Sequence, residues 1–489
     1  MLNRNDLPTL DPTDWQAFRA LAHRMVDEMI DGVQGLRQGP VWREMSEAAK
    51  DVIRHESLPR EPQGEVKAYE DFLEHVKPYR LGNPHPRFHG WVMGPGLPLA
   101  SMADMLASDV DPNCAGGNQG SYFVEMQVVD WMKEAMGYDA NASGILSSGG
   151  SMGNLTALNV ARHAKAGFDV RANGLHNAPK LTFYGSTETH SWVQKAAELM
   201  GLGSESFRMS PVDASYRVDV EDVRRRIAED RANGFQPFCV IANVGTVNTG
   251  AIDDINALAD LCHAEGLWLH ADGAFGALAA VSPALRPLVD GLERVDSVVF
   301  DLHKWMYLPF EIACTLVKDP VAHRAAFAKG AAYLATSHRG FVTEGLQISE
   351  RGFELSRGFK ALKAWMCIKA YGMDCFADAI EMNVEEARHL TRLVEADPSL
   401  ELVAPTMLNI VCFRYRSDSI SGDRLNALNE ELLLRLQERG LAMPSGTTIS
   451  GKYVIRVAIV NHRTRFEDMD ALVADVLGIG EELAMEWRD

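Results

Sequence analysis

The feature that most constrains this fold is an alternation of short apolar runs with helix-like stretches between about residues 140 and 320. The runs FCVIANV (238–244), LWLHA (267–271) and DSVVF (296–300) are short and rich in β-branched residues. The helix-like stretch IDDINALADLCHAEG separates the first two. Such alternation predicts βαβ units and a mainly parallel sheet. We therefore expect an α/β fold whose ligands bind at the carboxyl ends of the strands.

The flanking segments predict two further units. Pro12-Thr13-Asp14 is typical of a helix start, and apolar residues then recur at helical spacing as far as Ile30. A long helix is expected around 355–395, and residues 399–489 contain two apolar runs, MLNIVCFRY and YVIRVAIV, among helical patterns. The predicted units are an N-terminal helical arm (1–84), a large domain (85–380) and a small α+β C-terminal domain (381–489).

The charge and cysteine content exclude several classes of partner. The chain of 489 residues carries 48 Lys and Arg against 67 Asp and Glu, a formal net charge of −19. This excess of acid disfavours nonspecific nucleic-acid and anionic-membrane binding. The N-terminus lacks an apolar signal core, no run approaches the ~18 apolar residues of a membrane helix, and seven Cys form no CxxC pair. We expect a cytoplasmic protein with neither nucleic-acid nor membrane partners.

A glycine-rich turn occupies residues 148–154, between ASGILS and the helical LTALNVARHAKA. Glycines that lead directly into a helix present free backbone N–H groups and the positive end of the helix dipole to an anion. The sequence SGGSMGN matches neither GxGxxG nor GxxxxGK[ST], so it is not a nucleotide motif by pattern. It predicts either a phosphate-binding turn or a plain turn.

Three polar residues follow other predicted strands. Asp272 ends an apolar strand, where a carboxylate needs a cationic or donor partner, although a helix N-cap is the alternative. Lys304 follows DSVVF, where desolvation would lower the pKa of its amine as a Schiff-base lysine requires, although a surface lysine is the alternative. His190 follows LTFYGS and could stack on a planar ligand, or be a satisfied surface histidine.

Together these groups are the set that pyridoxal phosphate (PLP) requires. The phosphate binds at a helix N-terminus, a carboxylate keeps the pyridine nitrogen protonated, and a lysine forms the aldimine. Asp272 and Lys304 are 32 positions apart, about one βαβ unit, so both can reach one crevice. The sequence therefore predicts a PLP site.

The sequence resembles the PLP-dependent amino-acid decarboxylases, which include aromatic-L-amino-acid, histidine and glutamate decarboxylases, and looks nearest the first of these. The resemblance implies the PLP-dependent transferase fold (aspartate aminotransferase-like, fold type I). The HKW segment with HxDxA about thirty residues upstream is its most specific part. The matching segments are HPRFHGWV (85–92), GILSSGGSMGNLTAL (144–158), THSWVQKAAELMG (189–201), NVGTVNTGAIDDI (243–255), WLHADGAFG (268–276), DLHKW (301–305) and RVAIVNHRT (456–464).

The resemblance implies four catalytic residues. Lys304 would form the internal aldimine, Asp272 would pair with the pyridinium nitrogen, and His190 would stack over the ring. Tyr333, in GAAYLATSH, matches a tyrosine on the family's mobile loop. In the family this tyrosine delivers a proton to the carbanion. The implied reaction is decarboxylation of an L-amino acid to the amine and CO₂ through an external aldimine and a quinonoid.

The resemblance also implies the residues that hold the cofactor. Gly150, Ser151 and His303 would bind the phosphate. Thr246 would line the site near the ring, and Ala274 would pack on the ring.

On the substrate side, the resemblance points to Trp91, Asn113, Ala115 and Arg357. Relatives that act on aromatic substrates surround the substrate ring with apolar side chains of the partner subunit, whereas Asn113 is polar and Ala115 is small. Asp301 stands where some relatives carry Asn near the phosphate, and a second anion there would be unfavourable unless its side chain points away. The resemblance further implies a homodimer with active sites at the interface, in which the N-terminal arm covers the partner.

Other interpretations remain open at this stage. The chain could be another PLP enzyme of the same fold, such as an aldehyde synthase, a sulfinate lyase or an aminotransferase. It could be a noncatalytic scaffold on a decayed enzyme fold, which retention of Lys304, Asp272 and His190 argues against. A metal site from His190, His270 and His303 has no HxH or HExxH spacing to support it, so no metal is expected.

Overall fold

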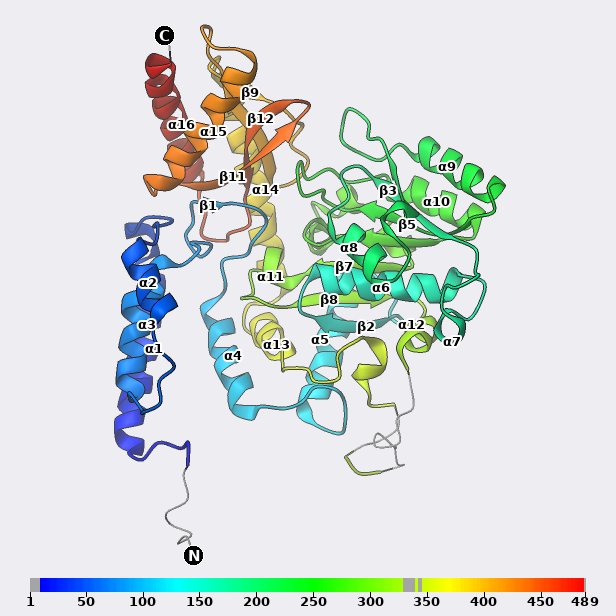
Figure 1. Cartoon of the computed structure of the whole chain (residues 1–489), viewed down its shortest axis with the longest axis horizontal. Helices are drawn as coiled ribbons and strands as arrows, with labels where there is room; N and C mark the ends of the chain where they lie inside the picture. Colours follow the sequence, from blue (N-terminus) through cyan, green and yellow to red (C-terminus); the bar gives the residue numbers. More distant parts are fainter. Residues whose placement is uncertain (1–8, 329–338, 342–344, 488–489) are drawn as a thin grey trace, which may run out of the picture.

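A seven-stranded, mainly parallel sheet is the larger of the two sheets in the computed structural model, which describes residues 9–328, 339–341 and 345–487, and it lies in the right-hand part of Figure 1. Its strand order is β2-β8-β7-β6-β5-β3-β4. Neighbours from β7 to β4 pair in parallel, whereas β8 runs antiparallel to both β7 and β2. The expected α/β fold is confirmed. The strands are β2 (Ser143–Ser147), β3 (Leu181–Ser186), β4 (Phe207–Ser210), β5 (Gln236–Asn243), β6 (Trp268–Asp272), β7 (Ser297–Asp301) and β8 (Ala313–Val317).

Helices cover both faces of this sheet because successive side chains of a strand point to opposite sides. In β5, Cys239 and Ile241 pack in one apolar cluster, and Val240 and Ala242 pack in another. The first cluster contains side chains of α6 (Gly150–Lys165), α8 (Trp192–Leu199) and α12 (Pro320–Phe327). The second contains side chains of α5 (Gly120–Met136), α9 (Val220–Ala232) and α10 (Ile255–Glu265). The central strands are therefore buried on both faces, which explains their continuous apolar runs.

A second, five-stranded sheet lies toward the C-terminus, with the order β1-β11-β12-β10-β9. The runs MLNIVCFRY and YVIRVAIV form β10 and β12, as their apolar character predicts. Helices α15 (Gly422–Glu438) and α16 (Phe466–Glu486) pack in the same apolar core. The strands are β1 (Phe88–His89), β9 (Leu400–Leu402), β10 (Ile410–Tyr415), β11 (Met443–Ile449) and β12 (Lys452–Ala458).

The helix expected around 355–395 is two helices, α13 (Ala361–Tyr371) and α14 (Met373–Ala396). Gly372 separates them with a φ of 75°, a conformation that glycine adopts readily and that ends a helix. The start of α14 packs in the core of the large sheet and its end packs in the core of the small sheet. The predicted boundary between residues 380 and 381 therefore falls inside a continuous helix, and β1 of the predicted large domain pairs with the small sheet.

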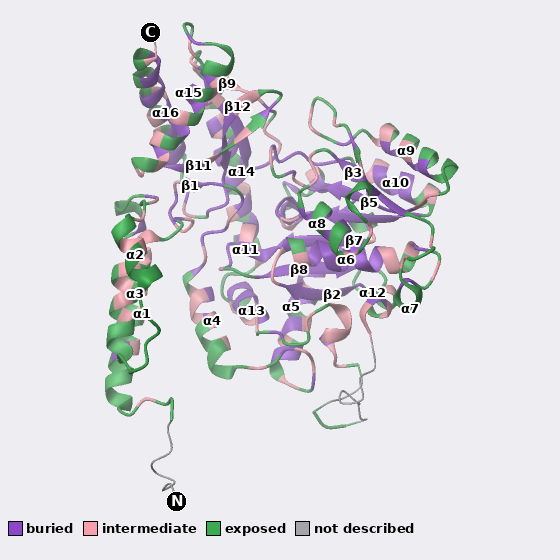
Figure 2. Ribbon diagram, in the orientation of Figure 1, coloured by how far each residue is buried: buried purple, intermediate pink, exposed green. Residues whose placement is uncertain are grey.

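The N-terminal arm consists of α1 (Trp15–Gln34), α2 (Glu47–His55) and α3 (Glu65–His75), drawn in blue at one side of Figure 1. Asp14 caps α1 by accepting from the backbone N–H groups of its first turn, as the sequence predicts. Within these described helices Leu21 alone is buried, and Figure 2 draws the arm mostly as exposed. Apolar side chains such as Phe18 and Phe72 are therefore open to solvent in the single chain.

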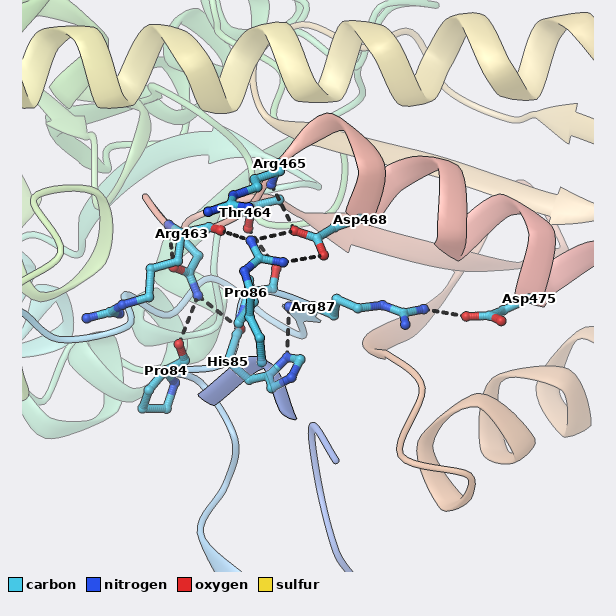
Figure 3. Close-up of polar contacts among 11 residues, drawn as sticks. Pro84, His85, Pro86, Arg87, Arg463, Thr464, Arg465, Asp468 and Asp475 are labelled. Carbon is cyan, nitrogen blue, oxygen red and sulfur yellow. Dashed lines mark hydrogen bonds and ion pairs between the residues drawn. The ribbon is translucent and has the colours of Figure 1, made fainter. Parts of the chain in front are cut away.

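Polar contacts tie the segment before β1 to α16 and to the residues just before it (Figure 3). The hydroxyl of Thr464 donates to the carbonyl of Pro86 at 2.7 Å, and Arg87 forms an ion pair with Asp475. These contacts fix the chain where it leaves the arm. The remaining α-helices of the described chain are α4 (Pro98–Val110), α7 (Val170–Asn173) and α11 (Leu302–Trp305). No helix in the described ranges is long and apolar enough to cross a bilayer.

Candidate active site

A cavity of about 450 Å³ lies at the edge of the large sheet where β5, β6 and β7 end and α6 begins. This is the edge at which open α/β sheets bind ligands. The cavity brings together nine residues singled out from the sequence: Trp91, Gly150, Ser151, His190, Thr246, Asp272, Ala274, His303 and Lys304. Tyr333 lies outside the described residues.

The glycine-rich turn forms one wall of the cavity, at the N-terminus of α6. A Cβ atom added to Gly150 would lie 3.0 Å from Asp301 Oδ2 and 3.5 Å from the Cβ of Ala274, so a side chain there would crowd the floor of the cavity. The first N–H groups of a helix have no partner within the helix. This wall therefore offers backbone donors and a positive helix dipole to an anion such as a phosphate.

Asp272 ends β6 and is buried, with 7% of its surface exposed. Its Oδ2 accepts a hydrogen bond of 2.6 Å from the indole Nε1 of Trp192, and its Oδ1 accepts one of 3.3 Å from the backbone of Ala274. The Asp272 carboxylate thus has the hydrogen-bond donors that burial requires. The shorter of these bonds comes from a side chain 80 positions away and not from a helix N-terminus, unlike a simple N-cap.

His190 faces the cavity from the turn before α8. Its Nδ1 accepts a hydrogen bond of 3.2 Å from the backbone N–H of Trp192. Desolvation lowers the pKa of the imidazole below its usual value. The ring is therefore neutral at neutral pH, with its proton on Nε2, and is available to stack on a planar ligand.

Lys304, in the short helix α11, is paired with Asp301, a residue whose contacts the sequence did not predict. Its Nζ lies 2.9 Å from Oδ2 of Asp301, which ends β7 and has 2% of its surface exposed. Among the described residues, Oδ1 of Asp301 has no hydrogen-bond partner. The carboxylate of Asp301 does not point away from the cavity but forms part of its floor.

His303 and Thr246 complete the lining. The Nδ1 of His303 contacts the backbone of Ile312, and desolvation lowers the pKa of the His303 ring. The hydroxyl of Thr246 lies 3.0 Å from that of Thr249 and accepts from the backbone N–H of Ala251. Each side chain is therefore held by groups that are near it in the chain.

Two residues that support this site were missed from the sequence. Trp192 contacts both Asp272 and His190, as described above, but only its place two positions after His190 could have signalled it. Arg456 of β12 donates to the carbonyl of Trp91 at 2.8 Å and to that of Asn248 at 3.2 Å. A charged residue within the apolar run YVIRVAIV was the available signal, and burial lowers the pKa of its guanidinium to about 10.

The other substrate candidates gather elsewhere in the single chain. Arg357 donates its backbone N–H to Oδ1 of Asn113 at 3.1 Å. The third candidate, Ala115, is two positions after Asn113 in the chain. The guanidinium of Arg357 is buried in an ion pair of 2.6 Å with Glu125. None of the three candidates lines the cavity. In the single chain, the guanidinium of Arg357 donates to Glu125 and to the backbone carbonyls of Cys114 and Leu146, and its contact with substrate stays a prediction.

The three histidines of the metal alternative do not converge. Both ring nitrogens of His270 are engaged, Nδ1 with the hydroxyl of Ser297 at 2.9 Å and Nε2 with Oδ1 of Asn154 at 2.7 Å. In the part of the chain that the structure describes, no group of three or more His, Cys, Asp or Glu side chains is arranged to hold a metal ion.

The donor set of the cavity fits PLP. Free helix N–H groups suit the phosphate, the buried carboxylate of Asp272 suits the pyridine nitrogen, and the amine of Lys304 suits the aldehyde. The crowding around Gly150 shows that this wall is shaped for a ligand rather than a side chain. Together with the mainly parallel sheet, these features define a PLP-dependent enzyme of the aspartate aminotransferase-like class.

Comparison with known proteins shows which family of PLP-dependent enzymes the chain resembles. Residues 49–416 match the pyridoxal-dependent decarboxylase conserved domain. The chain is 34% identical to an aromatic-L-amino-acid decarboxylase of Bacillus atrophaeus (96% of this chain and 97% of the relative), and 27% identical to a phenylacetaldehyde synthase of Arabidopsis thaliana (92% and 93%). The crystal structure of Oryza sativa TDC with PLP and tryptamine superposes with a TM-score of 0.88 over 98% of this chain and 100% of that one, at 23% identity.

The chain belongs to the pyridoxal-dependent decarboxylase family. It is a PLP-dependent carboxy-lyase that acts on an amino acid, and the predicted cofactor and fold type are confirmed.

Proposed function

We propose that this enzyme decarboxylates an aromatic L-amino acid to the corresponding amine, as a homodimer in the cytoplasm. The observation that carries the proposal is the cavity in which Lys304, Asp272 and His190 meet beside the glycine-rich wall. The aromatic preference is supported by the relative from Bacillus atrophaeus. It is also supported by Trp91 and Phe310, which line the cavity with about half of their surfaces exposed.

The proposed roles follow from the positions of the side chains. When bound, PLP forms a covalent bond to an amine and withdraws electrons from the substrate α-carbon as CO₂ leaves. Lys304 supplies the amine that holds the cofactor, and Asp272 holds a proton at the pyridine nitrogen. Gly150 and Ser151 bind the phosphate, and His190 packs on the ring. The role of Tyr333 rests on the family resemblance, and we propose that it delivers the proton to the α-carbon.

A panel of L-amino acids tests the proposed substrate class. We expect CO₂ release from phenylalanine, tyrosine or tryptophan at a kcat/KM at least about tenfold higher than from glutamate or cysteine sulfinate, which lack an aromatic ring to pack on Trp91 and Phe310. Release from an acidic substrate alone would contradict the proposal. Because a phenylacetaldehyde synthase is among the relatives, the products should be separated into amine and aldehyde, and we expect the amine.

Replacing Tyr333 by Phe is expected to slow amine formation about 10²- to 10⁴-fold, because a positioned general acid contributes that much. The share of aldehyde should rise as reaction with oxygen competes. Chromatography of the two products provides the measurement. Tyr371→Phe, which changes a tyrosine of α13 that does not line the cavity, is the matched control. Amine formation at the wild-type rate by Tyr333→Phe would show that the proton comes from elsewhere.

Replacing Asp301 by Asn is expected to tighten PLP binding about threefold to tenfold. The buried carboxylate would repel the phosphate, and its ion pair with Lys304 stabilises the cofactor-free protein. Equilibrium dialysis measures the change. Pyridoxal, which lacks the phosphate, should show a smaller gain. Weaker binding of PLP by the variant would mean that Asp301 helps to hold the cofactor.

The proposed dimer rests on the exposed apolar side chains of the N-terminal arm, which need a surface to cover them. Light scattering should give twice the chain mass of 53.9 kDa. A monomer at micromolar concentration would contradict the proposed dimer.

The proposed cytoplasmic location rests on the sequence composition. The division into an arm, a large domain and a small domain is also a proposal, for which the two separate sheet cores give support.

A further inference from the structure

Trp192 is the first residue of α8 and touches two of the groups that surround the cofactor position. Its indole Nε1 donates to Oδ2 of Asp272 at 2.6 Å, and its backbone N–H donates to Nδ1 of His190 at 3.2 Å. Only 3% of the tryptophan surface is exposed. We propose that Trp192 is a positioning residue that keeps the carboxylate of Asp272 aimed at the pyridine nitrogen of PLP, an inference that rests on the proposed role of Asp272.

The indole hydrogen bond is the shorter of the two that the Asp272 carboxylate receives. The other comes from the backbone of Ala274 at 3.3 Å, and it reaches the other oxygen. Without Trp192, Oδ2 would lose the side-chain hydrogen-bond donor that it has in the described part of the chain. The indole N–H and the backbone N–H together fix the orientation of the carboxylate. A carboxylate held beside the pyridine nitrogen stabilises the protonated ring, so the indole N–H acts on the ring through the position of Asp272.

Trp192 is itself held in place by a buried polar network. Its ring packs edge-on against His270, with centroids 6.1 Å apart and an interplanar angle of 88°. His270 is fixed in turn by Ser297 and by Asn154 at 2.9 and 2.7 Å. The indole therefore cannot swing away from Asp272 without disturbing side chains of α6, β6 and β7.

The charged and titratable groups around Asp272 do not replace this contact. Burial lowers the pKa of His270, so this neighbour on β6 is neutral at neutral pH. His190, before α8, is neutral for the same reason. Across the cavity, Lys304 is paired with Asp301. The indole N–H is thus the side-chain donor on which Asp272 depends.

The test compares Trp192→Phe with Trp268→Phe in the holoenzyme. Trp268 is also 3% exposed, and its indole also donates a buried hydrogen bond, to the hydroxyl of Ser297 at 2.8 Å. Both variants lose the same volume and one N–H donor, but only Trp192 contacts Asp272. We expect Trp192→Phe to bind PLP about tenfold more weakly, the loss expected for a hydrogen bond to a charged group. Trp268→Phe should bind it as the wild type does.

The visible absorption of the bound cofactor gives a second readout that altered packing alone would not move. Because a carboxylate that is no longer held against the pyridine nitrogen stabilises the protonated ring less, the ring-protonation midpoint should fall by about one pH unit in Trp192→Phe only. If Trp192→Phe does not fold, benzothienylalanine at position 192 makes the same comparison, since it keeps the ring shape and replaces the N–H by sulfur.

Asp272→Asn separates the inference from the proposed function. Wild-type affinity and midpoint in Asp272→Asn would overturn the role of Asp272, and the inference with it. A large change in Asp272→Asn beside wild-type values in Trp192→Phe would overturn the inference alone and leave Trp192 as a packing residue.

Discussion

With Lys304 replaced by Ala, the purified protein is expected to carry no covalently attached PLP. Its CO₂ release should fall at least about 10²- to 10⁴-fold, the range for loss of a positioned acid–base group. Lys304 is the one lysine among the described residues that line the cavity, and it follows β7 at the ligand-binding edge of the sheet. Borohydride reduction followed by mass spectrometry checks the prediction, because the wild type should gain the mass of the cofactor on the peptide that contains Lys304.

The loss of catalytic activity in Lys304→Ala must be separated from a loss of folding stability in the same variant. Lys304→Ala leaves the buried carboxylate of Asp301 without its cation, which destabilises a folded protein. The double variant Lys304→Ala with Asp301→Asn should therefore melt at a higher temperature than Lys304→Ala and remain inactive. Lys318→Ala, which changes a lysine bonded to the carbonyl of Glu293 outside the cavity, should retain activity and label normally. Cofactor fixed by borohydride in Lys304→Ala would identify another attachment point.

Asp272 and Lys304 were predictable because the topology brings them together, whereas Thr246, Ala274 and His303 were expected only from the family resemblance. Asp272 ends β6 and Lys304 follows the neighbouring parallel strand β7, so their side chains meet at one sheet edge. The start of α6 was predictable for the same reason, since glycines that lead into a helix can only form its N-terminal turn. Strand periodicity and the order of residues along the chain carry this information.

The rest could not be predicted because it depends on how far side chains reach across the fold. The contact from Trp192 to Asp272 joins residues 80 positions apart, and Arg456 reaches Trp91 from the other sheet. The two-residue strand β1 is too short to show any periodicity. The break at Gly372 lay within an otherwise continuous helical pattern, where an isolated glycine is tolerated.

Arg357 is the clearest example of a long-range contact that the sequence did not predict. Its position after the loop segment suggested contact with substrate, but its partner Glu125 lies 232 positions earlier in the chain, on α5. The exposed fractions of the two side chains are 2% and 1%. The guanidinium also donates to the carbonyls of Cys114 and Leu146. These contacts join the start of α5 and the end of β2 to the segment before α13, so the structure favours a role in folding.

Replacing Arg357 by Met is therefore expected to lower the free energy of unfolding by about 3–5 kcal/mol, because it leaves a buried carboxylate without its partner. Adding Glu125→Gln should recover about 1–2 kcal/mol by removing the orphaned charge, although the carbonyls stay unpaired. Urea denaturation of the holoenzyme provides the measurement. Arg388→Met breaks an exposed ion pair with Glu385 and should change stability by less than about 1 kcal/mol. Wild-type stability in Arg357→Met, together with a tenfold higher KM, would instead support the substrate contact that the sequence suggested.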